Sequence, residues 1–326
     1  MMNFTEQYRQ QFLTEEYYVN ALNHYNESIN LFIESDAFED DEYNCGEASR
    51  WSLITATDLD ILYLKYTAGQ AIEEMIPLFE KVIEGYEKQA EALAIFHKSE
   101  KPSVIATQSA TLNILGLAFL LNRNDLFARI HQLVNGEGER HSGEDEIINK
   151  FFKLNDPKHL TINEGKLFSL PYSSLCDVID NVLIKNNKER ALEHLDAYLS
   201  DWYQMNKHET WYNSHLDLEN SSAYSGYWAF EAAALVYLLD LDDSVLHKYL
   251  FYPKDIVQWA RSQKPSYEPN LDTQQYSIAA GEICPRSGYW FTVAKENSRQ
   301  YFNEGDVFPD FKNSWGMVYW QFSGEE

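Results

Sequence analysis

The sequence predicts a mainly α-helical protein, a two-domain helical bundle that carries a small β-containing C-terminal extension. Apolar residues recur at helical spacing through most of residues 5–262. Within that range, residues 224–239 are apolar on nearly every face, which is typical of a helix buried at the centre of a bundle. From residue 263 onward, Pro and Gly interrupt short runs of Tyr, Trp and Phe, a pattern that favours short strands.

The N-terminal half is predicted to form one helical domain, residues 1–135. The apolar spacing indicates helices over residues 5–33, 49–67, 71–98 and 103–121, and a short helix that ends near residue 134. The run Glu39, Asp40, Asp41 and Glu42 interrupts this spacing, and because like charges repel we expect a loop there. Residues 135–145 contain several glycines and no hydrophobic residue, which predicts a boundary between two domains.

The second helical domain is predicted to span residues 146–262. Helices are expected over residues 146–153, 167–185 and 188–205, followed by the central helix over 224–239. Ser225 is a suitable N-cap for the central helix. Glu231 would share a face of that helix with Tyr227 and Trp228, and its buried carboxylate would need a hydrogen-bond partner or water.

The chain after the central helix is predicted to change character. Pro253 suits the first position of one more helix, with Asp255 favourably placed in its first turn. The extension, residues 263–326, has strand signals over residues 288–293 and 317–322.

Composition limits the classes of partner. The 26 Lys and Arg residues against 51 Asp and Glu residues give a net charge of −25, which argues against direct binding to nucleic acid or to an anionic membrane. A basic protein is the natural partner, although an acidic surface can also serve solubility alone. The three cysteines lie far apart without a CxxC pair, so no disulfide framework or zinc site is indicated. With no export signal or long apolar span, we expect a cytoplasmic protein that needs no cofactor.

No catalytic motif stands out, and an enzyme is not predicted. His208 with Glu209 and His215 with Asp217 lack the spacing of a metal site such as HExxH. One enzymatic alternative is a helical glycan hydrolase that uses Glu231 as an acid. Its groove would be lined by the aromatic residues Trp202, Trp211, Tyr212 and Trp228.

Residues 211–261, with the elements GYWAFE, LDD and YPKD, resemble the C-terminal domain of the PoNi family. These immunity proteins neutralise PoNe-type DNase toxins of bacterial polymorphic and type VI secretion systems. The first half, especially the opening helix and residues 53–86, is similar to the family's helical N-terminal domain. The extension, with Cys284, residues 288–291 and residues 315–320, resembles a module of other type VI immunity proteins, so an effector that is not a nuclease remains an alternative.

The resemblance implies an immunity protein that binds a cognate toxin, in an oligomeric state that the sequence leaves open. A basic DNase groove would attract acidic clusters and accept aromatic anchors. The expected acidic contacts are Glu39, Asp40, Asp41, Glu42, Asp217, Glu219, Asp242 and Asp243, and the expected aromatic contacts are Trp211, Tyr212, Tyr224 and Tyr252. The residues expected to serve the fold are Gly226, Tyr227, Trp228, Glu231, Pro253 and Asp255.

Overall fold

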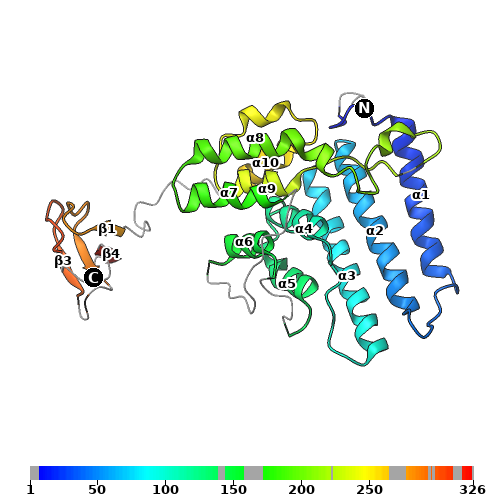
Figure 1. Ribbon diagram of the computed structural model, residues 1–326, viewed down its shortest axis with the longest axis horizontal. Coiled ribbons are helices and arrows are strands. Elements are labelled where there is room, and N and C mark those ends of the chain that lie inside the picture. The colour runs from blue at the N-terminus through cyan, green and yellow to red at the C-terminus, as the bar shows by residue number, and fades with distance from the viewer. Residues whose placement is uncertain are drawn as a thin grey trace. The chain divides into compact units, whose positions relative to one another are not determined.

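The computed structural model describes residues 7–138, 144–157, 172–221, 223–263, 277–292, 295, 298–310 and 318–324. The chain divides into two compact units, Met1–Gln263 and Lys264–Glu326. The first is helical and the second contains a four-stranded antiparallel sheet, so the predicted mainly α class with a small β-containing C-terminal part is confirmed (Figure 1). Within the described residues, no helix is long and apolar enough to cross a membrane.

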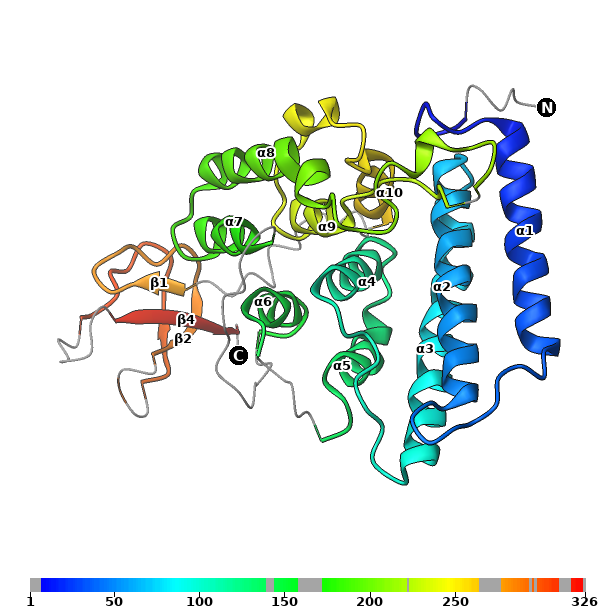
Figure 2. The same cartoon turned by 45° about the vertical axis from the view of Figure 1, so that its right-hand side comes forward.

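Three long helices open the first unit and lie side by side (Figure 1, Figure 2). They are α1 (Glu15–Glu34), α2 (Gly46–Thr67) and α3 (Met75–His97), the last preceded by the 3-10 helix η2 (Ile72–Glu74). The first helix starts later than predicted because Thr14 caps it, accepting a hydrogen bond from the backbone N–H of Tyr17. Residues 7–13 are instead held by tertiary contacts. Arg9, for example, donates to Asp255 at 3.0 Å and to the carbonyl of Gln70.

The remaining helices of the first unit follow the predicted order. They are α4 (Gln108–Leu120), η3 (Asn124–Leu126), α5 (Phe127–Asn135), α6 (Glu146–Asn155), α7 (Ser173–Leu183), α8 (Lys188–Met205), η4 (Ser214–Leu216), α9 (Phe230–Leu238), η5 (Ser244–Lys248) and α10 (Lys254–Gln263). The predicted start of the helix at residue 167 lies outside the described residues. Pro253 directly precedes α10, one position from where it was expected.

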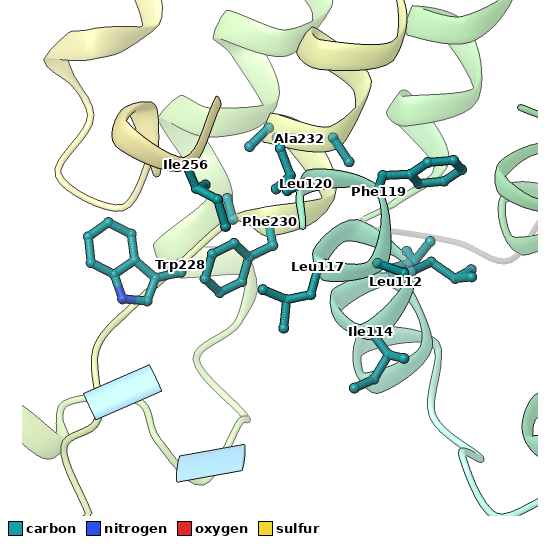
Figure 3. Close-up of a cluster of buried hydrophobic side chains, with 14 of the residues drawn as sticks. Leu112, Ile114, Leu117, Phe119, Leu120, Trp228, Phe230, Ala232 and Ile256 are labelled. Carbon is teal, nitrogen blue, oxygen red and sulfur yellow. The ribbon is translucent and has the colours of Figure 1, made fainter. Parts of the chain in front are cut away.

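The centre of the unit is the packing of α4 on α9, both apolar all round (Figure 3). Leu117 of α4 points toward Phe230 of α9. The two backbones approach so closely that a Cβ on Gly116 would lie 2.8 Å from the Phe230 carbonyl, so only glycine fits. One continuous cluster of buried side chains runs from Leu13 to Ala260 and includes helices on both sides of residues 135–145. The domain boundary expected there stays a prediction.

The central helix is shorter than predicted and begins at Phe230 rather than at residue 224. Residues 224–229 are not helical, because side chains from the first half bind their backbone. The hydroxyl of Tyr17 bonds both the N–H and the C=O of Tyr224, and Gln10 bonds the N–H and the C=O of Tyr227. Ser225 is therefore not an N-cap. The prediction that Glu231 shares a helical face with Tyr227 and Trp228 is wrong for the same reason.

The second unit is a sheet with strand order β1-β4-β2-β3. Its strands are β1 (Ser277–Ala279), β2 (Gly288–Phe291), β3 (Gln300–Phe302) and β4 (Tyr319–Gly324), all paired antiparallel. Strands were predicted close to β2 and β4, although residues 293 and 315–317 lie outside the described part. Trp290, Trp320, Phe302 and Phe308 form its core with Cys284.

Candidate partner-binding surface

The predicted acidic loop lies where α1 ends and α2 begins (Figure 2). Six acids, Glu34, Asp36, Glu39, Asp40, Asp41 and Glu42, fall between residues 34 and 42, and all six are exposed. No Lys or Arg occurs between residues 34 and 49. We call the exposed residues from 31 to 47 the acidic tip. It concentrates negative charge over a short stretch of chain.

Two of the tip's acids hold the loop in shape. Asp40 accepts the N–H of Gly46 at 2.8 Å and so places a negative charge at the N-terminus of α2. Asp41 accepts from the side chain and N–H of Asn44 and from the N–H of Tyr43, and these bonds lower its pKa. Glu39 and Glu42 form no hydrogen bond or ion pair within the described residues, which leaves their carboxylates to solvent.

Exposed apolar side chains lie among these acids. Tyr43 is 80% exposed, and Leu31 and Ile33 at the end of α1 are 65% and 54% exposed. Large apolar side chains with this much exposure, set among charges, are typical of interaction surfaces. Sequence reasoning selected the acids of the tip but missed Tyr43, which directly follows Glu42 and could have been recognised as an aromatic residue in a charged loop.

The predicted contacts of residues 211–219 are divided between core and surface. Trp211 is partly buried and stacks on Trp202 with ring centroids 5.4 Å apart, while Tyr212 packs against Tyr203. Asp217 and Glu219 are exposed. Glu219 lines a groove of about 1010 Å³ against α1, where Glu16 adds a second carboxylate and His24 a titratable ring. This groove is a second acidic surface.

Three predicted contacts are wrong because the residues are buried. Tyr224, Tyr252 and Asp243 are 0%, 3% and 5% exposed. Asp243 accepts from Arg261 at 2.8 Å and from the Tyr252 hydroxyl at 2.7 Å. Burial alone would raise the pKa of Asp243, but these bonds outweigh it and the pKa is lowered. Asp242, beside it, is exposed and accepts the N–H of Ser244.

The residues expected to serve the fold are internal or bonded to neighbouring segments. Gly226 has φ of +119°, and a Cβ there would lie 2.0 Å from the Thr67 hydroxyl. That hydroxyl accepts from the Trp228 indole and donates to the Ser225 carbonyl. The buried Tyr227 hydroxyl bonds the His215 ring at 2.8 Å. Thus His215 has a structural partner in the core.

Glu231 does not line an exposed groove, as the glycan hydrolase alternative required. It is 1% exposed, and one of its oxygens accepts from the Tyr198 hydroxyl at 2.7 Å and the Trp202 indole at 2.8 Å. Burial raises the pKa of Glu231. Over the described ranges, no group of three His, Cys, Asp or Glu side chains could hold a metal ion.

Comparisons with known proteins agree with the helical fold of the first unit. Residues 143–256 match the family model of PoNe immunity proteins (PoNi), C-terminal. A search of the curated proteins finds no match. Among solved structures, the chain is similar to the crystal structure of protein PA2201 from Pseudomonas aeruginosa, with 15% sequence identity and a TM-score of 0.59 over 79% of this chain and 92% of that chain. At that identity the likeness shows the fold alone. Residues 143–256 thus resemble the C-terminal domain of the PoNi family, in agreement with the resemblance of residues 211–261.

Proposed function

We propose that this protein is an immunity protein that binds and inhibits a PoNe-type DNase toxin in the cytoplasm of the cell that produces it. The observation that carries the proposal is the match of residues 143–256 to the PoNi C-terminal domain. Inhibition by binding alone requires no chemistry from the protein. The proposal is therefore consistent with the buried, structural role of Glu231.

The acidic tip is our candidate for the first contact with the toxin. A DNase holds phosphates in a basic groove, and a net charge of −25 attracts such a groove over distances of about 10 Å at moderate salt. Attraction between charges raises the association rate, while exposed apolar side chains such as Tyr43 supply desolvated contact area. The groove at Glu219 is the second candidate surface.

The function is tested by expressing the neighbouring toxin-like reading frame in bacteria with and without this chain. We expect chromosomal DNA to be degraded in its absence and preserved in its presence, with survival restored. Absence of rescue by a well-expressed chain would contradict the immunity function itself.

The contribution of the tip is tested separately with the purified pair. The double variant Glu39→Gln/Glu42→Gln removes two charges that form no bond in the described structure. Its matched control, Glu189→Gln/Asp201→Asn, removes two exposed charges from α8. The tip variant should slow association several-fold at low salt, and the control should not. Equal effects of the two variants would show that only net charge matters.

A second candidate function is immunity against an effector that is not a nuclease. It is favoured by the second unit, Lys264–Glu326, which is compact by itself and lies beyond the family match. The same expression experiment separates the two candidates. Cells that die with intact DNA, and are rescued by this chain, would identify a toxin of another kind.

A further inference from the structure

A pocket of about 230 Å³ lies where the two halves of the first unit meet. Its lining comes from α2, α4, α8 and the non-helical segment before α9, and it includes Asp60, Asn113, Asn206, Trp211 and Ser225. Thr210 and Ala223, both exposed, also line it and connect it to solvent. The volume is below the roughly 300–1,000 Å³ of pockets for drug-sized ligands, so it suits a single side chain or a small ion.

Asp60 is the charged group of this pocket. One of its oxygens accepts from the Ser225 hydroxyl at 3.1 Å, and burial raises its pKa to about 6. In the described part of the chain, no Lys, Arg or His forms an ion pair with Asp60 or lines the pocket. The ionised carboxylate therefore lacks a countercharge. Charges in poorly hydrated sites are normally paired.

Two other buried acids of the first unit, Asp58 and Asp243, have the countercharge that Asp60 lacks. Asp58, two residues earlier on α2, contacts the ammonium of Lys81 at 2.7 Å. Asp243 is paired with Arg261 at 2.8 Å. The fold thus supplies a cation to each of these carboxylates but not to Asp60. A strongly perturbed acid in a cleft, without a charged partner, is a candidate for a binding role.

Among the residues that the structure describes, the titratable neighbours of Asp60 supply no positive charge. The titratable groups that interact with it are tyrosines: Tyr17 and Tyr25 of α1 and Tyr63 of its own helix. Glu231 of α9 also acts on Tyr63 and on Tyr172. The pKa of Tyr63 is raised, first by burial, so its hydroxyl is neutral at physiological pH. Asp60 therefore supplies the negative charge that lines the pocket.

The walls suit a flat or compact organic cation. Tyr63, Tyr172, Trp202 and Trp211 contribute aromatic rings, and aromatic faces attract guanidinium and ammonium groups. Asn113 and Asn206 each donate their amide nitrogen to a helical carbonyl, which leaves the amide oxygen as the acceptor that each can offer. A guanidinium group has five N–H donors in a plane and can satisfy several acceptors at once.

We propose that the pocket at Asp60 binds one organic cation of the guanidinium or alkylammonium type, with the carboxylate of Asp60 as its counterion. A basic side chain of the toxin is one source of this cation. The toxin as the source of the cation rests on the proposed function. Binding of a free small cation does not depend on that function.

The test uses agmatine and n-butylammonium as probes on the full chain, with binding followed through the indole N–H signals of the tryptophans in NMR. At pH 8 we expect saturable shifts of the Trp202 and Trp211 signals. Asp60→Asn should weaken binding at least tenfold, while the matched variant Asp177→Asn, at an exposed acid of α7 outside the pocket, should not. Affinity should fall about tenfold per pH unit below about 6, as Asp60 takes up a proton.

Absence of probe-induced shifts at these two tryptophans at pH 8, or equal binding by wild type and Asp60→Asn, would overturn the proposal. The source of the cation is decided by measuring toxin affinity with the same variant. Weakening by at least tenfold identifies a toxin side chain, and unchanged toxin affinity with lost probe binding identifies a free cation. If the toxin does not bind at all, the proposed function fails and the probe result still decides the pocket.

Discussion

The substitution Asp60→Asn should stabilise the protein at neutral pH. Burial raises the pKa of Asp60 from 3.8 to about 6. Each tenfold change in proton affinity corresponds to 1.36 kcal/mol, so keeping this carboxylate ionised in the folded state costs about 3 kcal/mol. Asparagine retains an oxygen for the Ser225 hydroxyl and removes the charge. Since the amide also loses water on burial, we expect a gain of about 1–3 kcal/mol in the free energy of unfolding.

The pH dependence follows from the direction of the shift. Between pH 3.8 and about 6 the folded state binds the proton of Asp60 more tightly than the unfolded state does. Asp60 therefore destabilises the folded state less in acid than at neutral pH. This relative stabilisation is lost as the pH rises from 3.8 to about 6. The advantage of Asp60→Asn should be largest above pH 7 and smaller by about 2 kcal/mol near pH 4.5.

The assay is urea unfolding of wild type and variant, followed by far-ultraviolet circular dichroism at pH 4.5, 5.5 and 8. A melting temperature several degrees higher for the variant at pH 8 is the equivalent thermal result. Destabilisation by Asp60→Asn at pH 8, or an effect independent of pH, would refute the argument that Asp60 is an unpaired charge.

Three further predictions concern other named groups. Asp243→Asn should lower the free energy of unfolding by about 3 kcal/mol in the same urea assay at pH 8, because it leaves the Arg261 guanidinium without its carboxylate partner. The loss should be smaller in acid, since the lowered pKa of Asp243 contributes stability that disappears as the pH falls. Gly226→Ala should cost about 3 kcal/mol or more in the melting curve, whereas Gly281→Ala, also at positive φ but with nothing within 4 Å of the new Cβ, should cost about 1 kcal/mol. In stopped-flow mixing with the toxin, raising the salt from 50 to 500 mM should slow association of wild type more than that of the double variant at Glu39 and Glu42, and identical salt dependence would remove the tip from the contact.

Amphipathic helices were predictable because their burial follows the helical repeat. The helix α8 (Lys188–Met205) agrees with its predicted range, and α2 and α3 differ by a few residues at their ends. The segment 224–229 was not predictable, since its apolar composition is compatible with helix. It is not helical because Gln10, Tyr17 and Thr67 bind its backbone from distant positions.

The site was predictable only in part, for a similar reason. The exposed acids of the tip could be selected from their density in the sequence. Asp58 and Asp60, however, are two residues apart on one helix, and the sequence does not show which of them meets Lys81. Their different environments arise from which elements pack against each face of α2. An acid within the apolar stretch Leu59–Leu62 was the available signal for Asp60.

Within the region of family resemblance, some residues build the fold and others are accessible to a partner. The GYWAFE element, residues 226–231, is buried or bonded to the first half through Gln10 and Thr67. Its side chains hold the two halves together, and residues 226–228 also form part of the wall of the pocket at Asp60. Under the proposed function, the candidates for choosing a toxin are the accessible groups of the acidic tip and of the pocket at Asp60. The acidic tip lies outside residues 143–256, whereas the pocket takes Asp60 and Tyr63 from α2 and most of its other lining residues from within that range. The candidate contacts are therefore divided between the N-terminal helices and the region that matches the family model.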